Sequence, residues 1–139
     1  MNDVKWLAEL DLRFLGPELD PKCKTAILKQ DFSVQIREMI FLAPEGMITD
    51  GASIPRLFWR LIGSPFTGKY RRAAIIHDAA YQGKLELYTD KGAKISTRLD
   101  RLSSDGLFLV LMEADGASQV LSHTIYQAVR IAGRWSWTA

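Results

Sequence analysis

The chain has 139 residues, the length of one ordinary domain, and its 47% hydrophobic and 24% charged residues are typical of a soluble globular protein. The formal net charge of +2 is too balanced to indicate nucleic-acid binding, and no apolar stretch approaches the roughly 18 residues of a membrane-spanning helix. A single cysteine, Cys23, excludes an intrachain disulfide, so the fold has to depend on its hydrophobic core.

The first third of the chain predicts a small antiparallel β-sheet. Hydrophobic and polar residues alternate through residues 4–14, which predicts one half-buried strand, and they alternate again through residues 32–36. Residues 39–42 form a short apolar continuation, and Pro44-Glu45-Gly46 is a turn signal. We therefore assign residues 1–48 as the β-rich part of a single domain.

Residues 49–68 predict a loop and a short helix. The stretch from Thr49 to Arg56 is dense in turn-forming residues and contains Asp50 and Ser53. Either these two residues cap a turn and a helix, or they present a carboxylate and a hydroxyl to a site in one cleft with the helix that follows.

The stretch from Tyr70 to Gly83 predicts a short helix of small and apolar residues with three polar side chains near its end. His77 and Tyr81 are four residues apart and share a face, whereas Asp78 points to an adjacent face. Buried polar groups need hydrogen-bond partners, so this helix is where we expect chemistry.

Two further helices are predicted, from Thr97 to Gly116 and from Ser118 to Ala132. Arg101 and Asp105 are four residues apart, and the simplest interpretation is a surface ion pair. Gly106 predicts a close helix approach that lets Asp105 reach His77. The expected fold class is α+β: a small N-terminal antiparallel β-sheet followed by two antiparallel helices and a C-terminal helix, with residues 69–139 as the helical part.

The segment from Glu45 to Tyr81, with Thr49-Asp50-Gly51-Ala52-Ser53-Ile54-Pro55-Arg56 and Arg72-Ala73-Ala74-Ile75-Ile76-His77-Asp78, resembles a family common in phages and prophages. That family is known as domain of unknown function 1353. The later Arg101, Asp105 and Phe108 and the helix from Tyr126 to Gly133 also resemble it. The resemblance implies a phage or prophage origin and implies no reaction.

His77-Asp78 followed by Tyr81 is also similar to the active-site helix of secreted phospholipases A2. This second resemblance implies that His77 is the general base for a water molecule, that Asp78 binds calcium and that Tyr81 supports the site. Asp105 would be the carboxylate that orients His77. Carboxylates such as Asp78 and Asp50, with loop carbonyls, are suitable ligands for Ca²⁺.

This chain departs from that phospholipase pattern in two ways. Ile76 and Ala80 occupy the positions of cysteines that flank the histidine, and the glycine-rich calcium loop has only a loose counterpart at residues 63–68. A zinc hydrolase is less favoured, because His123, the second of two histidines, lies on a polar helix face.

Two functions therefore remain open. The first is a calcium-dependent, phospholipase A2-like hydrolase that acts on phospholipid. The second is a non-enzymatic phage particle or assembly protein in which His77, Asp105 and Tyr81 form a structural polar network. Arg101 is a further candidate member of this cluster under either function. Because residues 1–12 contain no apolar signal-peptide region, we expect synthesis in the bacterial cytoplasm, with release on lysis or carriage in the virion.

Overall fold

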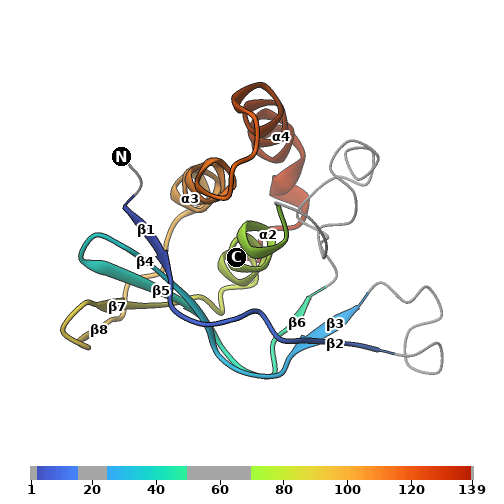
Figure 1. Ribbon diagram of the computed structural model, residues 1–139. Coiled ribbons are helices and arrows are strands. Elements are labelled where there is room, and N and C mark those ends of the chain that lie inside the picture. The colour runs from blue at the N-terminus through green and yellow to red at the C-terminus, as the bar shows by residue number, and fades with distance from the viewer. Residues whose placement is uncertain (1–2, 16–24, 50–69, 139) are drawn as a thin grey trace.

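The computed structural model describes residues 3–15, 25–49 and 70–138 and shows an α+β protein (Figure 1). Among these residues, antiparallel strands come first along the chain and helices dominate the second half. The strands are β1 (Val4–Trp6), β2 (Leu12–Phe14), β3 (Ala26–Leu28), β4 (Phe32–Ile36), β5 (Met39–Ala43), β6 (Ile48–Thr49), β7 (Glu86–Thr89) and β8 (Lys94–Ile95). The helices are α2 (Arg71–Tyr81), α3 (Arg101–Ala114) and α4 (Gln119–Ala132), followed by the 3₁₀ turn η3 (Gly133–Trp135).

The strands form two antiparallel sheets, one of five strands in the order β1-β4-β5-β7-β8 and one of three strands in the order β2-β3-β6. The prediction of one strand over residues 4–14 is wrong, because β1 pairs with β4 in the first sheet and β2 pairs with β3 in the second. The alternation of hydrophobic residues continues across the break because Val4 and Trp6 on one side of it and Leu10 and Leu12 on the other all pack against the core, whereas Phe14 at the end of β2 is exposed.

Residues 32–43 form a β-hairpin rather than a strand with an apolar continuation. β4 and β5 pair in the register Ile36 to Met39, so the turn contains only Arg37 and Glu38. Arg37 adopts a φ of 54°, a left-handed conformation that glycine or asparagine usually supplies in such turns. Later in the chain, β7 and β8 add a second hairpin to the same sheet by pairing β7 with β5.

Helix boundaries follow from local capping. Gly83, with a φ of 74°, follows the last turn of α2, as the sequence predicts for a helix C-terminus. The start of α3 lies later than the predicted Thr97, because the Asp100 side chain accepts a hydrogen bond from the Ser103 amide and caps the helix there. Ser118 caps α4 in the same way.

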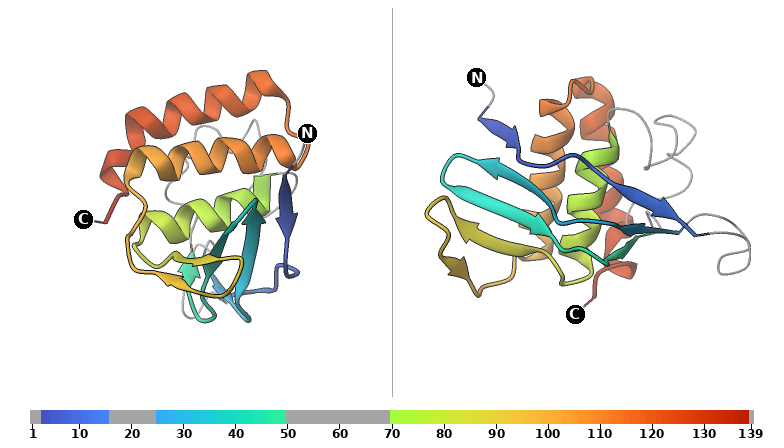
Figure 2. Two further views of the ribbon diagram at one scale, coloured as in Figure 1. Left: turned by 90° about the vertical axis from the view of Figure 1, so that its left-hand side faces the viewer. Right: turned by 60° about the horizontal axis from the view of Figure 1, so that its bottom comes forward.

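The three helices stack in layers on one side of the sheets (Figure 2). α2 packs against β5 and β6, α3 packs against α2, and α4 packs against α3 on the far side from the strands. Contacts between opposite ends of successive helices, such as Arg72 with Asp115 and Tyr81 with Asp105, show that α2 and α3 are antiparallel. The centre of the core is made by the fully buried Phe32, Val34, Ile75, Ile76, Phe108, Leu111, Met112 and Ile125.

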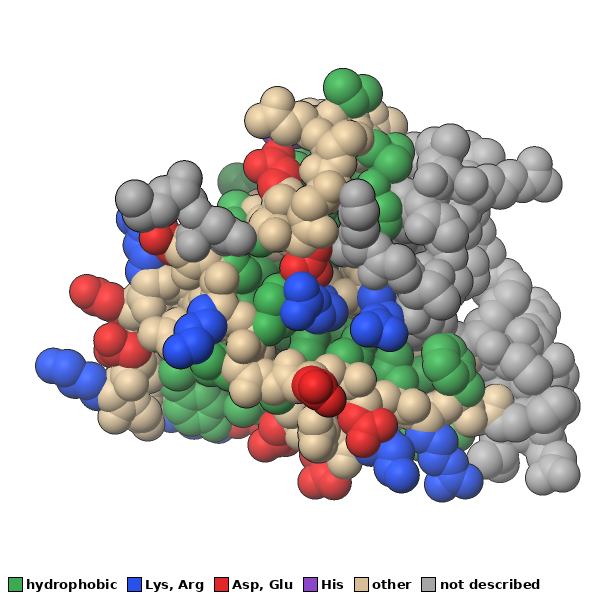
Figure 3. Space-filling model, viewed as in Figure 1, with side chains coloured by type: hydrophobic (Ala, Val, Ile, Leu, Met, Phe, Trp, Pro, Cys, Tyr) green, Lys and Arg blue, Asp and Glu red, His purple; other side chains and the backbone are tan. Residues whose placement is uncertain are grey.

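The surface carries charges of both signs. On the face seen in Figure 3, Lys and Arg side chains are interspersed with Asp and Glu side chains, and hydrophobic side chains show between them. None of the helices described by the structure has the length and apolar character needed to cross a membrane.

Candidate functional site

α2 is the most completely buried element of the described chain. Residues 73–81 are all buried, and they include the polar side chains of His77 and Asp78. Four alanines in this stretch leave room for α3 on one side and for the strands on the other, so the polar side chains are enclosed between layers. Each polar group in such a position needs a partner, and the structure supplies them.

The central contact joins α2 to α3. The Nε2 atom of His77 lies 2.7 Å from Oδ1 of Asp105, and neither residue is exposed to solvent. The contact that the sequence predicts between these two residues is therefore present. A carboxylate at one ring nitrogen fixes the tautomer and the orientation of an imidazole.

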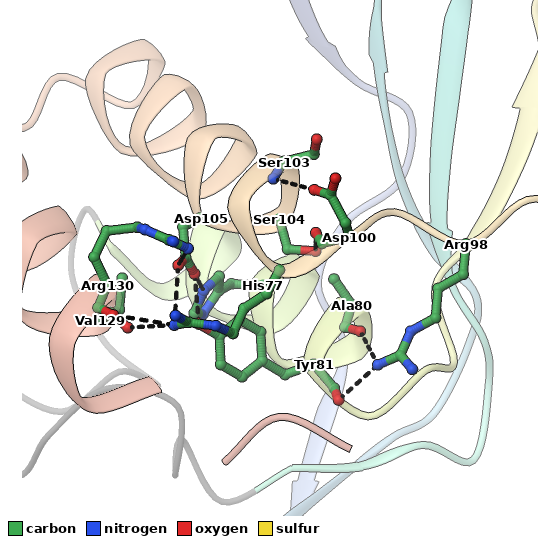
Figure 4. Close-up of polar contacts among 11 residues, drawn as sticks. His77, Ala80, Tyr81, Arg98, Asp100, Ser103, Ser104, Asp105, Val129 and Arg130 are labelled. Carbon is green, nitrogen blue, oxygen red and sulfur yellow. Dashed lines mark hydrogen bonds and ion pairs between the residues drawn. The ribbon is translucent and has the colours of Figure 1, made fainter. Parts of the chain in front are cut away.

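Asp105 also accepts hydrogen bonds from two other side chains, one on α2 and one on α4 (Figure 4). The Tyr81 hydroxyl donates to the same Oδ1 at 2.6 Å, and the Arg130 guanidinium of α4 donates to Oδ2 at 2.7 Å. Arg101 adds a longer ion pair, with its NH1 atom 3.7 Å from Oδ2. Asp105 thus connects all three helices, and a buried carboxylate with this many donors is well compensated.

These contacts set the charge of each group. Burial lowers the pKa of His77, against the hydrogen bond and the negative charge of Asp105, so the imidazole is neutral at neutral pH. Burial alone would raise the pKa of Asp105, but the hydrogen bonds from His77 and Tyr81 outweigh it and hold that pKa below its ordinary value. Burial and the bond to Asp105 raise the pKa of Tyr81 above its ordinary range.

Aromatic rings enclose the imidazole of His77. The Phe108 ring is stacked on it with a centroid distance of 4.4 Å, and the Tyr81 ring is tilted against it at 4.3 Å. Phe108 lies one turn after Asp105 on α3, so one helix supplies both the carboxylate and the stacking ring. The imidazole is therefore held in its plane as well as at its Nε2 atom.

Asp78 belongs to a second polar cluster, on the sheet side of α2. Its Oδ2 atom accepts hydrogen bonds from the Thr49 hydroxyl and, at 2.9 Å, from the Gln82 side chain. Gln82 also donates to the Ile48 carbonyl at 2.8 Å, which ties the end of α2 to β6. Thr49 is 1% exposed and Asp78 is 4% exposed, so this cluster is almost as enclosed as the first.

Asp78 and Asp50 are the two residues predicted to bind calcium. Ca²⁺ takes six to eight oxygen ligands, and Oδ2 of Asp78 accepts hydrogen bonds from the Thr49 hydroxyl and the Gln82 side-chain amide. No group of three histidine, cysteine or acidic side chains with metal-binding geometry occurs within residues 3–15, 25–49 and 70–138. Asp50 and Ser53, the other predicted residues near this position, lie outside the described residues.

Two predictions about α3 are corrected. Arg101 and Asp105 are not a surface pair, because Asp105 is fully buried and Arg101 also donates to the α4 carbonyls of Val129 and Arg130. Gly106 is not a point of close approach, since a Cβ atom added there would meet nothing within 4 Å. Asp105 reaches His77 because it is on the inner face of α3, and the glycine beside it has no part in the contact.

Sequence reasoning missed three members of these clusters: Arg130, Thr49 and Gln82. Arg130 lies on the predicted helix from Ser118 to Ala132, and the sequence alone does not show how that helix packs against the others. Thr49 lies in the turn-rich stretch that was considered for Asp50 and Ser53, and Gln82 is four residues after Asp78, a spacing at which helical side chains meet.

The fold and the site define an α+β protein with a buried histidine–aspartate pair between antiparallel helices. The model of the family described as "Protein of unknown function (DUF1353)" matches residues 26–129, and the chain belongs to this family. The matched segment contains His77, Asp78, Tyr81, Asp105 and Thr49.

Two relatives from Sinorhizobium fredii (strain NBRC 101917 / NGR234) are similar to parts of the chain. The uncharacterized protein y4iH is 31% identical over 113 residues, which are 80% of this chain and 42% of that protein. The uncharacterized protein y4jT is 57% identical over 35 residues, which are 25% of this chain and 10% of that protein. The chain therefore spans less than half the length of either relative, and no solved structure matches it at a significant level.

Proposed function

We propose that this chain is a hydrolase in which His77, oriented by Asp105, activates a water molecule for attack on an ester. The observation that carries the proposal is the 2.7 Å contact between His77 Nε2 and the buried Asp105 carboxylate. The Tyr81 hydroxyl bonds to the same carboxylate oxygen, which is the role that the phospholipase A2 resemblance implies for it.

The charges in the site suit a general base. A base has to be neutral before it accepts a proton, and burial lowers the pKa of His77 in that direction. Asp105 has a pKa below its ordinary value, so it is ionised and stabilises the imidazolium that forms during the reaction. Arg130 and Tyr81 hold this carboxylate in place without removing its charge.

The chemical step has two parts. Because Nε2 is bonded to Asp105, the Nδ1 atom of His77 would take a proton from water while the water oxygen forms a bond to the ester carbonyl carbon. When the tetrahedral species collapses, the bond from the carbonyl carbon to the leaving oxygen breaks, and the imidazolium gives its proton to that oxygen. The imidazole is thereby restored.

His77 is fully buried in this conformation, so the reaction requires an opening that admits water and substrate to the imidazole. The same burial favours a second candidate function, in which the cluster of His77, Tyr81 and Asp105 only stabilises the helices of a non-enzymatic phage particle or assembly protein. The two functions differ in one property: the hydrolase loses its activity when His77 is replaced, whereas the structural network has no activity to lose.

Phospholipid is the substrate class that the phospholipase resemblance favours, with Ca²⁺ as its cofactor. Asp78 and Asp50 are the proposed ligands of such an ion. We also propose that the protein is of phage or prophage origin. It would be synthesised in the bacterial cytoplasm and released on lysis or carried in the virion.

The test is hydrolysis by the purified chain of phospholipid vesicles and of a soluble chromogenic ester, each with added Ca²⁺ and with EDTA. We expect turnover that falls at least about 100-fold in His77→Gln, a loss in the range for a general base. The matched control is His123→Gln, because His123 is exposed on α4 and pairs with Glu113 at 3.2 Å. Turnover that survives in His77→Gln, or absence of turnover in every condition, would refute the hydrolase.

A further inference from the structure

The segment Gly133–Thr138 follows α4 and folds back onto the end of α2. The Thr138 amide donates to the Tyr81 carbonyl at 2.9 Å, so this segment satisfies a carbonyl that the end of a helix leaves without an intrahelical partner. The side-chain hydroxyl of Tyr81 also donates a hydrogen bond to Asp105. Tyr81 therefore contacts the segment Gly133–Thr138 through its backbone carbonyl and the Asp105 carboxylate through its hydroxyl.

Arg98 fastens this segment to the helix. Its NH2 atom donates to the carbonyls of Ala80 and Tyr81 at 3.1 and 3.0 Å (Figure 4), and its NH1 atom donates to the Thr138 carbonyl at 2.6 Å. The guanidinium also lies 4.0 Å from the centre of the Trp137 ring. That distance is within the range of a cation–π interaction.

Two residues of the segment contact the Tyr81 ring directly. The Trp137 ring meets it edge-on, with a centroid distance of 5.2 Å and an interplanar angle of 86°. At the hydroxyl end, a Cβ atom added at Gly133 would overlap the Tyr81 oxygen and lie 3.0 Å from Cε2 and Cζ. The phenol can therefore take this position only beside a residue without a side chain.

We infer that the segment Gly133–Thr138, fastened by Arg98, is a strap that positions the Tyr81 hydroxyl on the Asp105 carboxylate. Its effect on catalysis rests on the proposed hydrolase, whereas its effect on the His77–Asp105 pair does not. The strap lies entirely after residue 129, where the match to the family model ends.

The consequence is an effect on His77. The groups that face Asp105 are His77 and Tyr81 from α2, Arg101 from α3 and Arg130 from α4. If the Tyr81 hydroxyl moves away, Oδ1 of Asp105 loses one donor and accepts a stronger hydrogen bond from Nε2 of His77. Displacing the strap should therefore strengthen the hydrogen bond between His77 and Asp105.

The test is the NMR resonance of the proton on His77 Nε2, measured at one fixed pH in Gly133→Ala, Tyr81→Phe and the double variant. We expect this resonance to move downfield in each single variant, because a stronger hydrogen bond to Asp105 deshields the proton, and we expect the double variant to equal Tyr81→Phe. Gly106→Ala is the matched control, because a Cβ atom there meets nothing within 4 Å. An unmoved resonance in Gly133→Ala, or a shift that adds to that of Tyr81→Phe, would overturn the inference.

A second variant keeps the test decisive if Gly133→Ala does not fold. Arg98→Gln releases the segment without adding volume, so Thr138 amide exchange should become faster and the His77 Nε2 proton resonance should move downfield. Faster exchange with an unchanged resonance would refute the strap. Arg134→Gln is the control, because the Arg134 guanidinium lies over the exposed Trp135 ring and should leave His77 unchanged. The NMR result does not depend on hydrolysis, so the strap and the hydrolase can fail separately.

Discussion

His77 on α2 and Asp105 on α3 are joined at 2.7 Å between Nε2 and Oδ1, and neither side chain has any exposed surface. The two helices are antiparallel, and this contact lies near the C-terminal end of α2 and the N-terminal end of α3. The pair therefore stabilises the helix packing whether or not it also performs chemistry. Its structural role and its chemical role predict different mutant behaviour.

Asp105→Asn should destabilise the protein by roughly 3 kcal/mol, because it removes the charge that compensates Arg130 and adds an amide donor among four existing donors. Arg130 keeps 27% of its side chain exposed, so partial rehydration should limit the loss. The measurement is urea unfolding at pH 7. Asp90→Asn, at an exposed site, should change the free energy of unfolding by less than about 0.5 kcal/mol. Equal effects of the two variants would contradict this account.

Gly106→Ala should stabilise the protein by about 0.5–1 kcal/mol. Gly106 lies in the interior of α3, where glycine costs conformational entropy, and the added methyl group meets no atom within 4 Å. The midpoint of urea unfolding should rise with an unchanged slope. A destabilised variant would mean that the helices approach more closely at this position than the structure shows.

Thr49→Val should cost about 1–3 kcal/mol, because it leaves the buried Asp78 carboxylate without one of its donors while it keeps the shape of the side chain. Thr124→Val is the matched control. The Thr124 hydroxyl donates to the Val120 carbonyl one turn earlier on α4, at an exposed position, and its loss should be close to neutral. Thermal unfolding of the two variants side by side measures the difference.

Much of the fold could be predicted because hydrophobic periodicity encodes it. The alternation in residues 32–36 gave β4, and Gly83 correctly marked the end of α2. The break between β1 and β2 could not be predicted, since the alternation of residues 4–14 stays the same when the chain changes sheets. The β4–β5 turn was also missed, because Arg37 gives no turn signal although it adopts a left-handed conformation.

The candidate site was only partly accessible from the sequence. Contacts within one helix, such as the shared face of His77 and Tyr81, follow from spacing, and the pairing with Asp105 follows from the expected helix hairpin. Arg130 and Thr49 enter the clusters through the packing of α4 and β6, which depends on tertiary contacts. The positions of Asp50 and Ser53 remain predictions, because both lie outside the described residues.

The last prediction concerns pH. Burial holds the pKa of His77 below its ordinary value of 6.5, so the unfolded chain binds a proton more readily than the folded chain does. The neutral imidazole therefore contributes stability above about pH 6.5, and this contribution is lost as the pH falls towards the lower pKa of the folded state. Asp105 acts in the same direction at lower pH, because its pKa also lies below its ordinary value of 3.8.

We therefore expect the melting temperature of the wild-type chain to fall as the pH decreases from 6.5, before the carboxylates titrate. His77→Gln should lose this part of the pH dependence and keep the part below pH 4, because a glutamine amide can donate to Asp105 but cannot be protonated in this range. His123→Gln, at an exposed position on α4, should retain the wild-type decrease below pH 6.5. If the wild type and His77→Gln show the same decrease between pH 6.5 and 4, the buried imidazole is not the group that couples folding to protons.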